Sequence, residues 1–151
     1  MASMVIAIGT PAPAVAGVAG PGPVALVFYK ATCSVTQMAG PALAHLGEAY
    51  PGTVVGIGQD PPPDLATFAA THGWAFPQVP DLEPYPASNA YGIASAPTLV
   101  VLDGNGQVAD VVESWDREGM NRASATLAHL LGAAAEVLST EADGLPAFKP
   151  G

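Results

Sequence analysis

Two short apolar runs on either side of one amphipathic segment constrain the fold of this chain more than any other feature. The first run, PVALVFY at residues 23–29, and the second, TVVGIG at residues 53–58, have the composition of strands buried on both faces. Between them, over residues 33–50, apolar side chains recur every three or four positions, as on one face of a helix: Val35, Met38, Ala42, Leu43 and Leu46. Two strands joined by a helix pair in parallel, so we predict a right-handed βαβ unit.

The rest of the chain continues this alternation of strands and helices. Residues 61–73 begin with three prolines and end with a glycine, which predicts an inserted helix, and residues 74–84 have the composition of a loop. Strand-like runs at 97–102 and 107–112 flank a DGNG turn and predict an antiparallel hairpin, after which Asp116 caps a last helix. We therefore predict an α/β fold with a central mixed sheet flanked by helices, the inserted helix lying between the βαβ half and the hairpin-helix half.

The size and charge of the chain limit its organisation and its partners. Its 151 residues, half of them hydrophobic, fit one domain at residues 1–131, with an N-terminal extension at 1–22 and a C-terminal tail at 132–151. The net charge of -9 repels phosphate groups, so neither nucleic acid nor a membrane surface is an expected partner. Residues 1–20 lack the basic start and unbroken apolar stretch of a signal peptide, so we expect a cytoplasmic protein.

Most other polar and aromatic candidates have structural explanations, and no metal or other cofactor is expected. The histidines lack the spacing of metal ligands: His45, His72 and His129. Three acids are expected to be solvated in loops or turns: Asp81, Glu83 and Asp103. The aromatic residues of the insertion either form an apolar cluster or wall a substrate groove: Trp74, Phe76 and Tyr85.

The single cysteine, Cys33, stands at the start of the first predicted helix. Unpaired backbone N–H groups and the positive end of the helix dipole favour a thiolate there, and the thiolate is the attacking form of the side chain. Lys30, three residues earlier, adds positive charge. The alternative is a cysteine packed as a small apolar residue. Its position at a strand-to-helix junction favours a reactive site.

The order of these elements resembles the thioredoxin superfamily, and two motifs sharpen the resemblance. In FYKATCSVTQMAGP a cysteine follows the first core strand, and Pro41 comes eight residues later, as the helix-kinking proline of thioredoxins does. The segment IASAPT at residues 93–98 is similar to the cis-proline loop of the family. The opening IGTPAPAV, the phrase VVGIGQD and the insertion at 59–91 resemble the TlpA-like and redoxin branch of small thiol oxidoreductases.

The resemblance implies roles for individual residues. Cys33 is the nucleophile with Lys30 beside it, and a cis bond before the proline of IASAPT aligns an extended peptide or a small disulfide. Four residues are implied as substrate contacts: Thr32, Ser34, Ala96 and Pro97. Thr36 stands where thioredoxins carry their second cysteine, and we expect its hydroxyl to donate a hydrogen bond to the Cys33 thiolate.

The sequence also departs from the family at positions that its chemistry uses. Without a second cysteine, no internal thiol resolves a mixed disulfide. Thr32 replaces a tryptophan, Val27 replaces a buried acid, and the Thr or Ser and the Arg of peroxiredoxins are missing, with Lys30 at the first position. Three functions stay open: a monothiol oxidoreductase that acts on protein or low-molecular-weight thiols and is resolved by an external thiol, a one-cysteine peroxidase, and a redox-inactive binding or scaffold domain.

Overall fold

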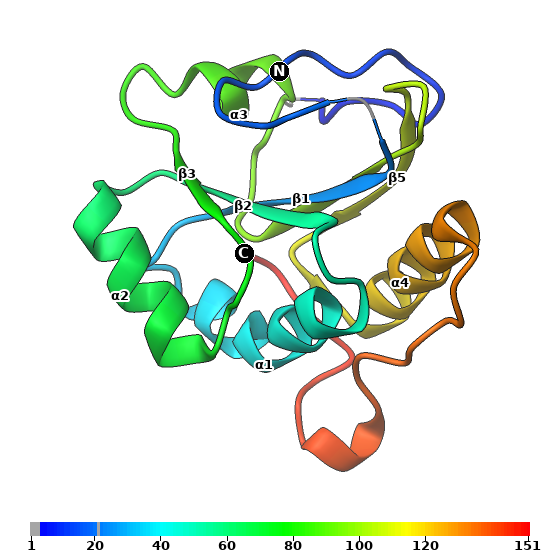
Figure 1. Cartoon of the computed structure of the whole chain (residues 1–151). Helices are drawn as coiled ribbons and strands as arrows, with labels where there is room; N and C mark the ends of the chain where they lie inside the picture. The colour runs from blue at the N-terminus through cyan, green and yellow to red at the C-terminus, as the bar shows by residue number, and fades with distance from the viewer. Residues whose placement is uncertain (1–3, 21) are drawn as a thin grey trace.

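The computed structural model describes residues 4–20 and 22–151 and contains one five-stranded sheet (Figure 1). The strands follow the spatial order β3-β2-β1-β4-β5. Their bounds are β1 Val24–Tyr29, β2 Val54–Gly58, β3 Gln78–Pro80, β4 Thr98–Leu102 and β5 Val108–Glu113. The first three pair in parallel, and β4 is antiparallel to both β1 and β5. The predicted βαβ unit, hairpin and mixed sheet are therefore confirmed.

Helices cover both faces of the sheet, and most of them lie on one side. Their bounds are α1 Ser34–Ala49, α2 Pro62–His72, α3 Pro86–Ala90 and α4 Arg117–Leu131. In Figure 1, α1 and α4 lie under the sheet with α2 beside α1, whereas α3 lies above it. Asp116 caps α4 as predicted, because its carboxylate accepts a 3.1 Å hydrogen bond from the Gly119 N–H. In the described residues, no helix is long and apolar enough to cross a membrane.

The side chains of β1 alternate between two apolar cores. Ala25, Val27 and Tyr29 belong to the core under α1 and α4. Leu26 and Phe28 belong to the smaller core on the opposite face, where they pack with the N-terminal extension. β1 is therefore covered on both faces along its whole length. After its last residue the chain turns into α1. This turn contains the candidate cysteine.

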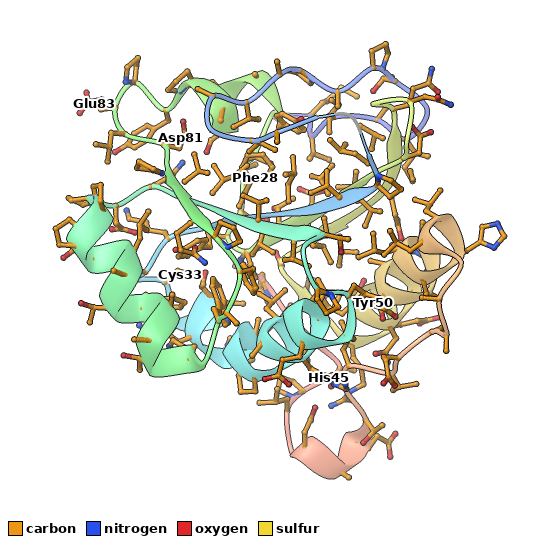
Figure 2. All side chains as sticks on the ribbon, in the orientation of Figure 1. Phe28, Cys33, His45, Tyr50, Asp81 and Glu83 are labelled. Atoms are coloured by element: carbon orange, nitrogen blue, oxygen red, sulfur yellow. The ribbon has the colours of Figure 1, made fainter. Side chains whose placement is uncertain are left out.

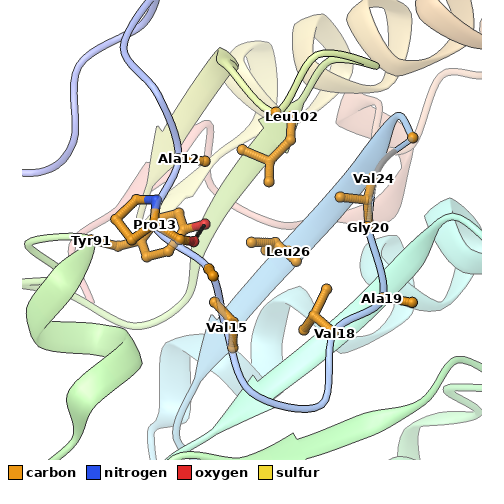
Figure 3. A pocket seen from close by; sticks show the side chains of 13 residues that line it. Ala12, Pro13, Val15, Val18, Ala19, Gly20, Val24, Leu26, Tyr91 and Leu102 are labelled. Atoms are coloured by element: carbon orange, nitrogen blue, oxygen red, sulfur yellow. Dashed lines mark hydrogen bonds between the residues drawn. The ribbon is translucent and has the colours of Figure 1, made fainter.

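The N-terminal extension closes the second face of the sheet. Pro11 forms an isolated bridge with Gln107, and the Tyr91 hydroxyl donates a 2.7 Å hydrogen bond to the Pro13 carbonyl. Burial raises the pKa of Tyr91 to about 12. The extension and the sheet leave between them an apolar cavity of about 170 Å³ (Figure 3). Its lining includes Leu26 and Leu102 from the sheet and Val15 and Val18 from the extension.

One strand lies in a segment that the sequence predicts as a loop. Gln78–Pro80 forms β3 at the edge of the sheet, beside β2. A strand of three residues is too short to reveal the alternation of buried and exposed side chains that marks a strand, and its terminal proline is typical of a loop. An edge strand tolerates proline because one of its sides carries no ladder of hydrogen bonds.

The predicted C-terminal tail at residues 132–151 packs against the domain. Its segment β7 Phe148–Lys149 pairs antiparallel with β6 Trp115–Asp116, which directly precedes α4. Leu138 is buried, and its backbone N–H donates a 2.8 Å hydrogen bond to the side chain of Asn121. The tail thus returns from the end of α4 toward the edge of the sheet where the candidate cysteine lies.

Candidate functional site

Cys33 is the N-cap residue of α1 and lies at the turn after β1 (Figure 2). Its N–H donates a 3.0 Å hydrogen bond to the Lys30 carbonyl, and its own carbonyl accepts from the Gln37 N–H at 3.1 Å. The side chain is half-buried and makes no capping hydrogen bond to the helix. The thiol is therefore held at the helix N-terminus while part of it stays accessible.

The cysteine meets the IASAPT loop, 63 residues away in sequence. Its Sγ donates a hydrogen bond to the Ala96 carbonyl at a distance of 3.4 Å. The Ala96–Pro97 peptide bond is cis, and Pro97 is buried. The Thr98 hydroxyl bonds back to the Ser95 carbonyl at 2.8 Å and fixes the loop before β4 begins. The structure thus brings Cys33, Ala96 and Pro97 together.

A buried carboxylate, which sequence reasoning missed, supports the turn before Cys33. Asp60 follows β2 and accepts a 2.8 Å hydrogen bond from the Ala31 N–H. The Ala31 carbonyl accepts from the Gln37 side chain at 3.1 Å, so both backbone groups of this residue are bonded. Burial, and then the charge of Asp60, raise the pKa of Tyr29. The signal in the sequence was an acid directly after a buried strand, in VVGIGQD.

The structure does not form the hydrogen bond expected between Thr36 and Cys33. Thr36 is fully buried, and its hydroxyl has no hydrogen-bond partner. The Cys33 sulfur bonds to Ala96 instead. Helical spacing places both residues near one face, but it does not decide where a buried hydroxyl points. The expected role of Thr36 as a donor to Cys33 is thus corrected.

The other predicted contact residues, and Lys30, are exposed and lie close to Cys33 in sequence. Thr32 and Ser34 flank Cys33 in sequence and are exposed. Lys30 is exposed and lines a cavity of about 160 Å³ together with Gln59 and Ala96. In the described part of the chain it takes part in neither of the two ion pairs. A cation therefore borders the site in an otherwise acidic protein.

The aromatic residues of the insertion form a packed cluster. The Trp74 ring stacks on Phe76 at a centroid distance of 5.0 Å and meets Tyr29 edge-on at 4.9 Å. Its indole N–H donates to the Gly40 carbonyl at 2.9 Å. Tyr85 does not belong to this cluster, since it precedes α3 with a left-handed φ of 56°. Trp74 and Phe76 are buried, so they pack the core instead of walling a groove.

The chain matches a known family and is similar to several solved structures. Residues 14–111 match the AhpC/TSA family, whereas no curated protein matches. DsbF of MTB is 23% identical, with a TM-score of 0.61 over 72% of this chain and 81% of that one. A putative thiol:disulfide interchange protein DsbE from Chlorobium tepidum is 21% identical, with a TM-score of 0.64 over 74% and 81%. The thioredoxin domain of a Bacteroides vulgatus thiol-disulfide oxidoreductase is 21% identical, with a TM-score of 0.62 over 72% and 90%. These likenesses show a thioredoxin-like fold.

Proposed function

Because the chain belongs to the AhpC/TSA family and has a thioredoxin-like fold, we propose that it is a thiol-disulfide oxidoreductase that uses one cysteine. The observation that carries this function is the contact between the Cys33 thiol and the Ala96 carbonyl, beside a cis-proline. The contact joins a nucleophile at a helix N-terminus to a loop whose backbone can align an extended substrate. A cytoplasmic location, expected from the sequence, is part of this proposal.

The reaction is an exchange of one disulfide bond for another. The Cys33 thiol loses its proton to solvent, and the thiolate attacks one sulfur of a substrate disulfide. A mixed disulfide forms between Cys33 and that sulfur, while the other substrate sulfur leaves as a thiolate and takes up a proton. An external thiol then loses its proton and attacks the substrate sulfur of the mixed disulfide; a new disulfide forms between these two sulfurs, and Cys33 leaves as a thiolate and takes up a proton. No internal thiol can do this, because Cys33 is the single cysteine of the sequence and Thr36 stands one turn later.

Lys30 brings a positive charge to the site. It is the cation closest to Cys33 in sequence, and it lines the cavity that Ala96 also lines. Positive charge there attracts anionic thiols and disulfides. The substrates that fit this site are protein disulfides and low-molecular-weight disulfides.

The peroxidase alternative is weakened because neither arginine of the sequence is free to act at the sulfur. Both arginines of the sequence lie outside the cysteine turn and bond to other groups. Arg117 bonds to Asp143 at 3.1 Å, and Arg122 bonds to Asp110 at 3.1 Å. A peroxide that oxidises Cys33 to a sulfenate would have no guanidinium from these two residues to polarise it.

The test is exchange with a small disulfide. Wild-type protein and Cys33→Ser are incubated with glutathione disulfide, and the intact mass is followed before and after addition of dithiothreitol. We expect one glutathione adduct on the wild type, its release by dithiothreitol, and no adduct on the variant. A wild type that forms no adduct would contradict the function and favour a scaffold, and consumption of hydrogen peroxide far faster than by a free thiol would favour a peroxidase.

A further inference from the structure

The segment 148–151 runs past the carbonyl to which the Cys33 thiol is bonded. A Cβ atom placed on Gly151 would overlap the Ala96 carbonyl oxygen. The same oxygen accepts the hydrogen bond of Cys33. The chain thus lies directly against the cis-proline loop, and only a residue without a side chain fits at position 151.

Ser114 links this segment to the cis-proline loop. Its hydroxyl accepts a 3.0 Å hydrogen bond from the Gly151 N–H and donates one to the Ser95 hydroxyl at 3.2 Å. Its N–H donates to the Pro97 carbonyl at 2.8 Å. Ser114 is buried and has a φ of 66°, a backbone conformation that strains a residue with a side chain. Such strained residues cluster at ligand-binding and switch regions.

The segment is held by buried partners before residue 148, and from residue 148 on by the two-residue pairing of β7 with β6 and the hydrogen bond to Ser114. The Trp115 indole N–H donates to the Pro146 carbonyl at 2.7 Å, and the Arg117 N–H donates to the Ala147 carbonyl at 3.0 Å. Phe148 is 56% exposed. Residues with exposed side chains and few contacts open at low free energy. Residues 148–151 can therefore lift when this two-residue pairing opens, while the preceding residues stay attached.

We propose that residues 148–151 form a displaceable strap over the thiol of Cys33, and that an extended polypeptide substrate takes the place of the strap at Ser114 and Ala96. The part of this inference that concerns the substrate rests on the proposed function. The strap also defines the kind of segment that fits, namely an extended chain with a glycine opposite the Ala96 carbonyl. The backbone N–H of that glycine donates a hydrogen bond to the Ser114 hydroxyl.

The test measures how fast iodoacetamide alkylates Cys33, the single thiol of the sequence. Gly151→Val places a side chain against the Ala96 carbonyl and excludes the strap. Ser114→Gly removes the hydroxyl at a position whose φ suits glycine. Val137→Ala, at an exposed position of the tail outside the strap, is the control. Circular dichroism and Trp fluorescence establish that each variant is folded.

We expect Gly151→Val and Ser114→Gly to react about tenfold faster than the wild type, because a strap that is closed about nine-tenths of the time leaves the thiol accessible for about one-tenth of it. The control should react at the wild-type rate. A folded Gly151→Val variant with the wild-type rate would overturn the strap. So would a control that accelerates equally.

A binding measurement separates the strap from the proposed function. A labelled peptide with the sequence of residues 145–151 is titrated into Gly151→Val and into the wild type, and fluorescence anisotropy reports binding. We expect binding to the variant and at least about tenfold weaker binding to the wild type, whose groove is occupied. Equal binding to both proteins, or to neither, would contradict the displaceable strap. Peptide binding without exchange of glutathione disulfide would keep the strap and remove the proposed function.

Discussion

The hydroxyl of Thr36 is a buried polar group without a partner, and its removal should stabilise the protein. Leaving a buried hydroxyl without a hydrogen bond costs about 1–3 kcal/mol. Thr36→Val replaces it with a methyl group of similar shape, which also buries more apolar surface. The side chain is 0% exposed, so solvent does not reduce this cost. We expect the free energy of unfolding to rise by about 1–2 kcal/mol.

Urea unfolding measures this change against a matched control. With a slope of about 1–3 kcal/mol per molar urea, the midpoint of the Thr36→Val transition should rise by roughly 0.3–2 M at constant slope. Thr67→Val, in α2, removes an exposed hydroxyl and should change the stability by less than about 0.5 kcal/mol. A Thr36→Val variant that is no more stable than the wild type would refute the reasoning, because its hydroxyl would then have a partner in the folded protein.

Three further perturbations test the site and the tail. Thr36→Cys should form an internal disulfide with Cys33 under mild oxidant, since position 36 is where the Cys-x-x-Cys motif at a helix N-terminus carries its second thiol; a thiol titration that still finds two free thiols would contradict this. Asp60→Asn should speed hydrogen exchange of the Ala31 amide at least about fivefold, because a weaker acceptor remains; unchanged exchange would show that the carboxylate does not hold the turn. Hydrogen bonds from the Ser139 hydroxyl and the Leu145 N–H, together with Arg117, hold the pKa of Asp143 below its ordinary value. The stability that the ionised carboxylate adds is therefore present above about pH 4 and is lost as the pH falls through the folded pKa of Asp143. Trp115 fluorescence, which reports the contact with Pro146, should therefore change in acid in the wild type and already be changed near pH 7 in Asp143→Asn; identical acid titrations of the two proteins would contradict this.

The elements that could be predicted are those whose pattern repeats along the chain. β1 alternates between two apolar cores, and the apolar stripe of α1 repeats every three or four residues. The cap of α4 was predictable because Asp116 acts on a backbone group only three residues away. In each case the information is local in sequence, and the fold follows from it.

The features that could not be predicted depend on contacts between distant segments. Asp81, expected to be a solvated loop acid, is buried and accepts hydrogen bonds from the Ser88 N–H and hydroxyl, at the start of α3. Asp60 likewise finds its partner, Ala31, 29 residues earlier. The sheet topology brings Asp60 and Ala31 together, whereas the loop between β3 and α3 folds Ser88 back onto Asp81, and no repeating pattern in the sequence marks either contact. The return of the tail to Ala96 has the same origin.

The central claim is that the fold makes Cys33 a reactive thiol, and its reaction rate with a neutral disulfide tests this claim most directly. The rate of reaction with 2,2′-dithiodipyridine is measured near pH 6, where an ordinary thiol with a pKa of about 8.5 is almost entirely protonated. The wild type and Gly151→Val are each compared with the same protein unfolded in urea. We expect the folded Gly151→Val protein to react at least about tenfold faster than its unfolded form, with the wild type between the two. A folded thiol that reacts no faster than the unfolded one in both proteins would contradict the claim and identify Cys33 as a packed side chain.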